Sequence, residues 1–266
     1  MYYSYEELKK HFEHELITIG KTQFNRNVWA IKFGSGGVLF QGAIHAREHV
    51  TAKLILNMAK YNKKHGILKN ACFVPVSNPD GVELSIKGIQ SVPVWVRKNV
   101  IDINKQSEDF SLWKANGMGV DLNLNFDAEW GKGKGNLRYP NPEGYIGQKP
   151  ESEIETQNLV RLTEREGYKI TFSFHAKGEE LYYGFKGVDS QKELTKSISE
   201  AIGYRCVETP LSVGGFKDWC VFKKNIPAYT IEFGRDDMGY VELYRDIDAL
   251  TEKCINLLKT VAQYGY

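Results

Sequence analysis

The stretch that most constrains this chain is residues 38–58, VLFQGAIHAREHVTAKLILNM. Val38-Leu39-Phe40 has the apolar character of a short buried strand, and after His45 apolar residues recur at helical spacing. We therefore expect a strand to end and a helix to begin around His45-Ala46-Arg47-Glu48-His49. In an open α/β sheet, ligands bind at the carboxyl ends of strands. The polar residues of this motif are thus candidates for a functional site.

From the residues alone, the motif has three interpretations. His45 and Glu48 lie three residues apart, so on a helical turn they share one face and suit a zinc ion. His-x-x-Glu-His is also the pattern of inverted zinc peptidases, in which His45 and His49 would bind the metal and Glu48 would be the base. The structural alternative is a polar helix start in which Glu48 complements the helix dipole.

Composition excludes several other classes of function. The 266 residues carry a net charge of +2 with 26% charged residues, which favours neither nucleic acid nor a membrane surface as a partner. No apolar run is long enough to span a bilayer and no signal-peptide pattern is visible, so we expect a cytoplasmic protein. The four cysteines are scattered without a C-x-x-C pair, so any metal must be bound by histidines and carboxylates.

Alternating strand and helix patterns predict a single α/β domain over residues 1–266. The expected architecture is a mixed, mostly parallel twisted sheet with helices on both faces. Strands are expected at 28–33, 38–40, 71–76, 169–174 and 228–233, and helices at 4–16, 152–166, 190–202 and 242–262. Residues 77–81 carry a strong turn signal, and residues 85–118 are expected to be irregular.

Two polar residues are associated with other expected strands. His175 follows the strand at 169–174, where it is either a satisfied core histidine or a third metal ligand. Glu232 lies inside the apolar segment Tyr229-Thr230-Ile231-Glu232-Phe233. Burying a carboxylate there costs on the order of several kcal/mol unless it is paired or bound to a metal. Glu232 is therefore a candidate functional acid.

Taken in order, these motifs resemble the zinc metallocarboxypeptidases of the carboxypeptidase A type. The resemblance covers nearly the whole chain and rests on His45–Glu48, Asn78-Pro79-Asp80-Gly81, Gly119-Val120-Asp121-Leu122-Asn123, Ser152-Glu153, His175 and Thr230-Ile231-Glu232. It implies about eight strands and one Zn²⁺ ion bound by His45, Glu48 and His175, with a fourth position open to water. Glu232 would take a proton from that water, and His49 would have no assigned role.

The resemblance also implies roles for four basic or polar residues outside the ligand set. Lys114 occupies a position where many relatives have an arginine, and it would stabilise the oxyanion. Arg97 is the competing candidate for that role. Arg47 and Asn123 match substrate-contact positions of the family.

Three departures from the family pattern bear on the substrate. Leu124 stands where typical members have an arginine that binds a free C-terminal carboxylate. Counted back from Glu232, the family's mobile tyrosine falls at Pro210, and the residue that sets specificity in the S1′ pocket falls at Lys217. A lysine there favours a substrate side chain that bears a carboxylate, whereas the alternative is a solvated surface lysine.

This combination resembles the bacterial branch that cleaves γ-D-glutamyl–meso-diaminopimelate bonds in cell-wall peptides, so the expected partner is a muropeptide. Three alternatives stay open. Leu124 argues against an ordinary carboxypeptidase that removes C-terminal residues. The matches at 78–81 and 119–123 argue against a related zinc deacylase of N-acyl amino acids. The complete set of ligands and base argues against a binding module without turnover.

Overall fold

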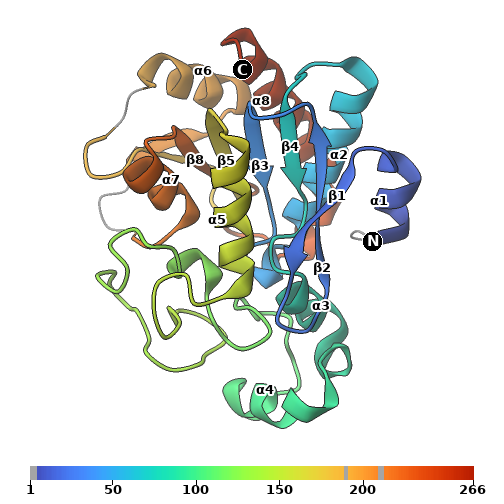
Figure 1. Cartoon of the computed structure of the whole chain (residues 1–266), viewed down its shortest axis with the longest axis vertical. Helices are drawn as coiled ribbons and strands as arrows, with labels where there is room; N and C mark the ends of the chain where they lie inside the picture. Colours follow the sequence, from blue (N-terminus) through green and yellow to red (C-terminus); the bar gives the residue numbers. More distant parts are fainter. Residues whose placement is uncertain (1–4, 189–190, 209–212) are drawn as a thin grey trace.

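The computed structural model describes residues 5–188, 191–208 and 213–266. Within these residues, eight strands form one sheet in the order β1-β2-β4-β3-β5-β8-β6-β7 (Figure 1). The strands are β1 (Leu16–Lys21), β2 (Asn27–Phe33), β3 (Val38–Gln41), β4 (Ala71–Val74), β5 (Ile170–His175), β6 (Glu180–Tyr183), β7 (Arg205–Glu208) and β8 (Ala228–Glu232).

The centre of the sheet is parallel, and antiparallel pairs flank it. β4, β3, β5 and β8 lie side by side in parallel, whereas β1–β2, β2–β4 and β8–β6 are antiparallel and β6–β7 is parallel. This confirms the expected mixed, mostly parallel sheet. The carboxyl ends of the four central strands therefore meet at one edge, which is where His45, His175 and Glu232 are found.

Helices cover both faces of the sheet, as expected. They are α1 (Tyr5–Phe12), α2 (Val50–His65), α3 (Pro79–Lys87), α4 (Arg97–Ile103), α5 (Ile154–Glu166), α6 (Lys192–Ile202), α7 (Phe216–Lys224) and α8 (Ile247–Gln263). α2, α6 and α8 pack together on one face, and α5 and α7 cover the other, where Figure 1 shows them in front of the sheet. No helix in the described part of the chain has the length and apolarity needed to cross a membrane.

Period-two alternation decides which face each strand residue joins. Phe172 and Phe174 of β5 belong to the larger hydrophobic cluster, which lies against α2, α6 and α8. His175 therefore points to the opposite face. In the β5–β8 register His175 pairs with Glu232, so both side chains leave the sheet on the same side. The alternation thus places an imidazole and a carboxylate next to each other at the strand ends.

An aromatic row on the other face holds these strands in register. The rings of Phe73, Phe40, Phe172 and Tyr229 come from β4, β3, β5 and β8. Their successive centroids are 5.1, 5.1 and 5.3 Å apart and the planes are nearly parallel. Cross-strand aromatic pairs of this kind stabilise a sheet beyond the area they bury. The row therefore helps to fix the positions of the strand ends that carry the polar residues.

Several sequence predictions of local structure were wrong. Residues 77–81 do not form a simple turn but start α3, because the Asn78 side chain accepts a hydrogen bond from Gly81 N and Pro79 is the first helical residue. Residues 85–118 are also less irregular than expected, since the end of α3, two short 3₁₀ segments and α4 lie there.

The sequence patterns did not predict three of these strands, and they predicted a first helix that is longer than α1. α1 ends at Phe12, and Leu16 already begins β1. Ile17 and Ile19 of β1, two residues apart, both pack against the hydrophobic cluster beneath α5. This spacing is typical of a strand rather than of a helix. The predicted N-cap of the first helix, Ser4, lies outside the described residues. β6 and β7 were not expected, because their sequences, ELYY and RCVE, lack the buried apolar runs that mark β3 and β4.

One buried acid makes the fold sensitive to pH. Glu155, in the first turn of α5, is almost completely buried, and Gln23 N donates to its Oε1 over 3.4 Å while Oε2 has no partner among the described residues. Burial, with a contribution from Asp80, raises the pKa of Glu155 to about 7 from a reference value of 4.5. Between these two values the folded state holds a proton that the unfolded state has lost.

We therefore expect the free energy of unfolding to fall by about 3 kcal/mol between pH 4.5 and pH 7 because of Glu155 alone. Glu155→Gln removes the titrating group, so its stability should not show this decline. Urea unfolding across pH 4.5–8 gives the free energy of unfolding of the unmodified protein and of Glu155→Gln. The difference between the two values isolates Glu155, because all other titrating groups are common to both proteins. A constant difference across this range would contradict the assignment.

Candidate metal centre

The chain between β3 and the metal-binding motif is held by Asn78. Its Nδ2 donates to Ile44 O and to Ala115 O, each over 3.0 Å, so it joins the segment before His45 to the segment after Lys114. A side chain at Gly81 would place Cβ 2.3 Å from Ala115 O, so this position has no room for one. The Asn-Pro-Asp-Gly motif thus positions the end of β3 rather than contributing a ligand.

Three buried side chains converge at the strand ends. His45 Nδ1 lies 2.8 Å from Glu48 Oε1, and His175 Nδ1 lies 3.1 Å from Glu48 Oε2. The two Nδ1 atoms are themselves 3.1 Å apart. One donor atom from each of the three residues lies within 4.8 Å of the others, a spacing that can hold one metal ion. We call His45, Glu48 and His175 the metal cluster.

The donor set of the metal cluster fits zinc. The Nδ1 atoms of His45 and His175 face each other beside the Glu48 carboxylate, so one cation can accept lone pairs from all three residues. Imidazole and carboxylate are ligands that suit Zn²⁺. Burial disfavours ionisation of Glu48, but His45 and His175 outweigh it and hold the pKa of that carboxyl below its usual range. Three protein ligands leave one coordination position for water or substrate, as in catalytic zinc sites.

His49 lies outside the metal cluster. Its Nδ1 is 2.9 Å from the Tyr244 hydroxyl, and the two rings are stacked with centroids 5.6 Å apart. Burial lowers the pKa of His49 to about 4, so it is neutral at physiological pH. The structure therefore brings together His45, Glu48 and His175 rather than the His45–His49 pair of the inverted motif.

Asp121 connects the metal cluster to Lys114. Its Oδ1 lies 3.2 Å from His45 Nε2, and its Oδ2 lies 3.1 Å from Lys114 Nζ. Burial opposes ionisation of Asp121, but Lys114 and His45 outweigh it and keep the pKa well below its ordinary value. A carboxylate on the far nitrogen of a metal-binding histidine fixes the ring orientation. Asp121 is therefore placed to orient His45, a role that the Gly119–Asn123 motif did not predict.

Glu232 lies at the end of β8, directly across from His175 in the strand register. Burial is the main cause that raises its pKa to about 8, against the opposing effect of His175 and with a contribution from Glu48. A carboxyl with a pKa near neutrality can both accept and release a proton at physiological pH. This property suits a general base beside a metal site.

A cleft of about 240 Å³ opens beside Glu232. It is lined by Asn123, Tyr182, Gly215, Lys217, Asp218, Thr230 and Glu232. Asn123 Oδ1 accepts a hydrogen bond from Phe216 N at the start of α7, which fixes its orientation. The cleft thus gathers two predicted substrate-binding residues, Asn123 and Lys217, around the predicted base.

Arg47 and Arg97, the other two predicted residues that the structure describes, lie in different environments. Arg47 Nη1 donates to Glu143 Oε2 over 2.8 Å, and its guanidinium lies 5.2 Å from the centre of the Tyr240 ring. Arg97 instead donates from Nε to Val92 O and from Nη2 to Gln90 O, so both hydrogen bonds are with the segment that precedes it. Pro210, the position counted for the mobile tyrosine, lies outside the described residues.

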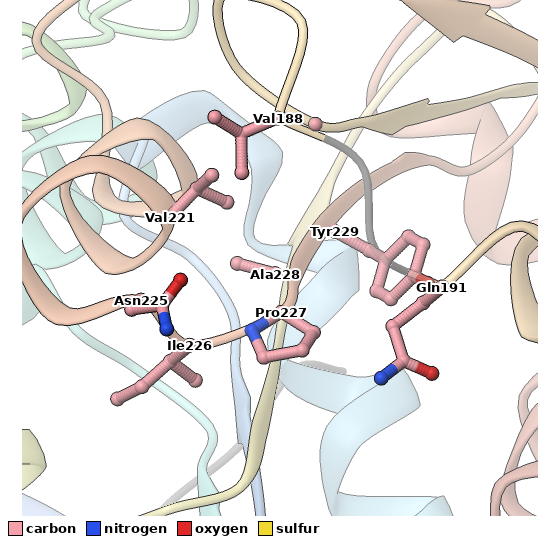
Figure 2. A pocket seen from close by; sticks show the side chains of 9 residues that line it. Val188, Gln191, Val221, Asn225, Ile226, Pro227, Ala228 and Tyr229 are labelled. Atoms are coloured by element: carbon pink, nitrogen blue, oxygen red, sulfur yellow. The ribbon is translucent and has the colours of Figure 1, made fainter.

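A second hollow lies at the opposite end of β8 (Figure 2). It has a volume of about 20 Å³ and includes Val188, Val221, Pro227 and Tyr229 in its lining. A space of this size holds little more than one water molecule. It also lies at the amino end of the strand whose carboxyl end carries Glu232. The cleft at the carboxyl edge is therefore the better candidate for substrate.

Comparison with known families gives a match over most of the chain. The model of the zinc carboxypeptidase family matches residues 5–255. Gamma-D-glutamyl-L-diamino acid endopeptidase 1 from Lysinibacillus sphaericus is 30% identical over 236 residues, covering 81% of this chain and 59% of the relative. Carboxypeptidase A2 from Mus musculus is 28% identical over 256 residues, covering 84% of this chain and 58% of the relative. The chain thus spans about three fifths of the length of these relatives.

Solved structures share the fold. Bovine thrombin-activatable fibrinolysis inhibitor, in complex with tick carboxypeptidase inhibitor, has a TM-score of 0.78 at 20% identity, with 99% of this chain and 97% of that chain covered. Murein-tripeptide amidase MpaA from Escherichia coli O157 has a TM-score of 0.60 at 20% identity, with 97% of each chain covered. At these identities the likeness is one of architecture.

Proposed function

Because the chain belongs to the zinc carboxypeptidase family, we propose that it is a metallopeptidase that hydrolyses the γ-D-glutamyl–meso-diaminopimelate bond of bacterial cell-wall peptides. The observation that carries the proposal is the metal cluster with Glu232 at its side and a polar cleft beyond. A relative whose name specifies a diamino acid substrate supports the choice of bond. Leu124, which cannot donate to a free C-terminal carboxylate, supports it against an ordinary carboxypeptidase.

In this proposal the metal cluster holds Zn²⁺, which when bound acidifies a water molecule and polarises the scissile carbonyl. The Glu232 carboxylate accepts the proton of the attacking water and returns it to the leaving amine. Burial raises the pKa of Glu232 above that of an exposed glutamate, which makes its carboxylate a stronger base. His175 faces Glu232 across the β5–β8 pair and so keeps the base close to the metal-binding side chains.

We propose that Lys114 stabilises the oxyanion. Its side chain is mostly buried and is held by Asp121, which also contacts His45, so the ammonium has a fixed position next to the metal cluster. Asp121 and Glu48 raise the pKa of Lys114 against the effect of burial, so it stays charged. Arg47 and Asn123 are proposed as substrate contacts, Arg47 through its guanidinium beside Tyr240 and Asn123 from the cleft wall.

Lys114→Met is expected to lower kcat/KM by about 10²-fold with zinc content unchanged, because the developing oxyanion loses one positive donor. Lys114→Arg should recover part of the loss. Arg97→Met is the matched control, since the Arg97 guanidinium contacts only loop carbonyls in its recorded hydrogen bonds. Steady-state kinetics of the three variants measures this. A loss in Arg97→Met equal to that in Lys114→Met would move the oxyanion role to Arg97.

Digestion of defined substrates tests the proposed bond. The zinc-loaded protein is incubated separately with γ-D-glutamyl–meso-diaminopimelate muropeptides, with C-terminal dipeptide reporters and with N-acyl amino acids, and the products are identified by mass. We expect cleavage of the γ-D-glutamyl bond at the highest kcat/KM. Preferred release of C-terminal residues would support the carboxypeptidase alternative, and preferred deacylation would support the deacylase.

A further inference from the structure

Lys217 is not a free cation in the cleft. It is only 5% exposed, and its Nζ lies 2.6 Å from Asp218 Oδ1 and 2.6 Å from Gly184 O. Asp218 is 1% exposed, and its Oδ2 accepts a hydrogen bond from Gly215 N. Both side chains line the cleft. The charge that the sequence suggested at Lys217 is therefore balanced by its neighbour inside the same wall.

Each member of this pair keeps some capacity for a ligand. An ammonium has three donors, and two of those of Lys217 have partners in the protein. A carboxylate has about four lone-pair positions, and Asp218 has two recorded partners. The pair can thus donate one hydrogen bond to an anion and accept others from a cation. A buried ion pair is also costly unless its remaining groups are satisfied.

The rest of the cleft is polar. Asn123 and Thr230 present an amide and a hydroxyl, and Tyr182 donates its phenol hydrogen to Glu180 Oε2. Glu180, which lies opposite Glu232 in the β6–β8 register, also forms an ion pair with Arg205. An apolar substrate side chain would displace water from these half-buried polar groups without replacing its hydrogen bonds. The lining therefore disfavours an aliphatic or aromatic side chain.

The balance of charges also disfavours a side chain with a single charge. A lone carboxylate would be attracted by Lys217 but repelled by Asp218, whose Oδ1 lies 2.6 Å from Lys217 Nζ. A lone ammonium would be attracted by Asp218 but repelled by Lys217. A group that carries both charges on one carbon can place its carboxylate against Lys217 and its ammonium against Asp218. Such a group satisfies both members of the pair at once.

We infer that the cleft selects a substrate residue whose side chain ends in an amino acid centre with both charges, read jointly by Lys217 and Asp218. This deepens the proposed function, on which it rests, because it identifies which part of a diamino acid is recognised. It also revises the sequence-based expectation that Lys217 alone favours a carboxylate. Asp218 becomes a specificity-determining residue that the sequence analysis did not single out.

Four γ-D-glutamyl substrates test the inference on the unmodified, zinc-loaded protein. The second residue is meso-diaminopimelate, lysine (ammonium only), 2-aminopimelate (carboxylate only) or norleucine (neither), with nearly constant side-chain length. We expect kcat/KM for diaminopimelate to exceed that for lysine and for 2-aminopimelate by about 10²-fold each, with norleucine cleaved most slowly. Values for lysine or 2-aminopimelate equal to that for diaminopimelate would overturn it.

Two variants separate recognition from a structural role. Asp218→Asn leaves Lys217 unbalanced, so preference should shift towards 2-aminopimelate, whereas Lys217→Met should shift it towards lysine. A merely structural role would lower all four values in proportion. Lys223→Met is the matched control, because Lys223 lies on the same helix but pairs with Asp127 at the surface. If either variant fails to fold, the substrate series on the unmodified protein still decides.

A binding measurement keeps the two proposals distinguishable. The same four amino acids, blocked at one centre as N-acetyl carboxamides, are titrated into the zinc-loaded protein by calorimetry. Tightest binding of the diaminopimelate compound without cleavage of any γ-D-glutamyl substrate would reject the proposed bond and retain the inference. Cleavage of all four substrates at similar rates, with equal binding, would retain the bond and reject the inference.

Discussion

Replacing Glu232 with glutamine is expected to lower kcat/KM on the peptide substrate by about 10³-fold while the protein still binds one zinc ion. The amide has nearly the same shape as the carboxyl but cannot accept the proton of the attacking water. Glu232 is not one of the three metal-cluster residues, so the metal content should not change. Steady-state kinetics together with metal analysis by mass spectrometry measures both quantities.

The matched control for this experiment is Glu164→Gln. Glu164 lies on α5 at the surface, paired with Lys224, so the same chemical change there should leave kcat/KM within a factor of about two. Turnover by Glu232→Gln at the rate of the unmodified protein would remove Glu232 from the mechanism. Loss of zinc from Glu232→Gln would instead make it a structural partner of the metal cluster.

Removing the metal is expected to abolish hydrolysis and to lower thermal stability. At a free zinc concentration of about 1,000 times Kd, binding to the folded state contributes about 4 kcal/mol, which corresponds to a Tm change of roughly 10 °C for a chain of this size. The reason is that three buried donors otherwise face each other without a cation. Calorimetric unfolding with chelator, and again after added zinc, measures the change.

Histidine variants identify which side chains bind the metal. His45→Gln should lose the zinc and the zinc-dependent part of Tm, whereas His49→Gln should keep about one zinc per chain because His49 contacts Tyr244 instead. The two substitutions are chemically identical and four positions apart, so each controls for the other. Zinc loss in His49→Gln with retention in His45→Gln would restore the inverted-motif interpretation.

The positions of His45, His175 and Glu232 were predictable because each follows a local rule. His45 comes after an apolar strand, His175 ends another, and Glu232 is an acid inside a third. In parallel strands these ends meet at one edge, so residues far apart in sequence could be expected near each other without any knowledge of side-chain contacts. The ordered motifs of a known family then selected His175 over His49 as a ligand.

The local errors have a physical cause as well. Asn78-Pro79-Asp80-Gly81 is compatible with a turn and with a helix start. The folded chain adopts the helix start, in which Gly81 N donates a hydrogen bond to the Asn78 side chain. β6 and β7 are four residues long and form because β8 offers β6 an unpaired edge. Such elements depend on tertiary partners that no local pattern encodes.

By itself the amino-acid sequence determined the class of fold, the nature of the metal donors and the strand ends on which they stand. These properties follow from period-two and helical apolar patterns and from which side chains can bind zinc. Two features became visible only in the tertiary structure: the contact of Asp121 with His45, and the ion pair in which Asp218 neutralises Lys217. Charge balance and burial depend on distances between side chains, and these exist only once the helices and strands have packed.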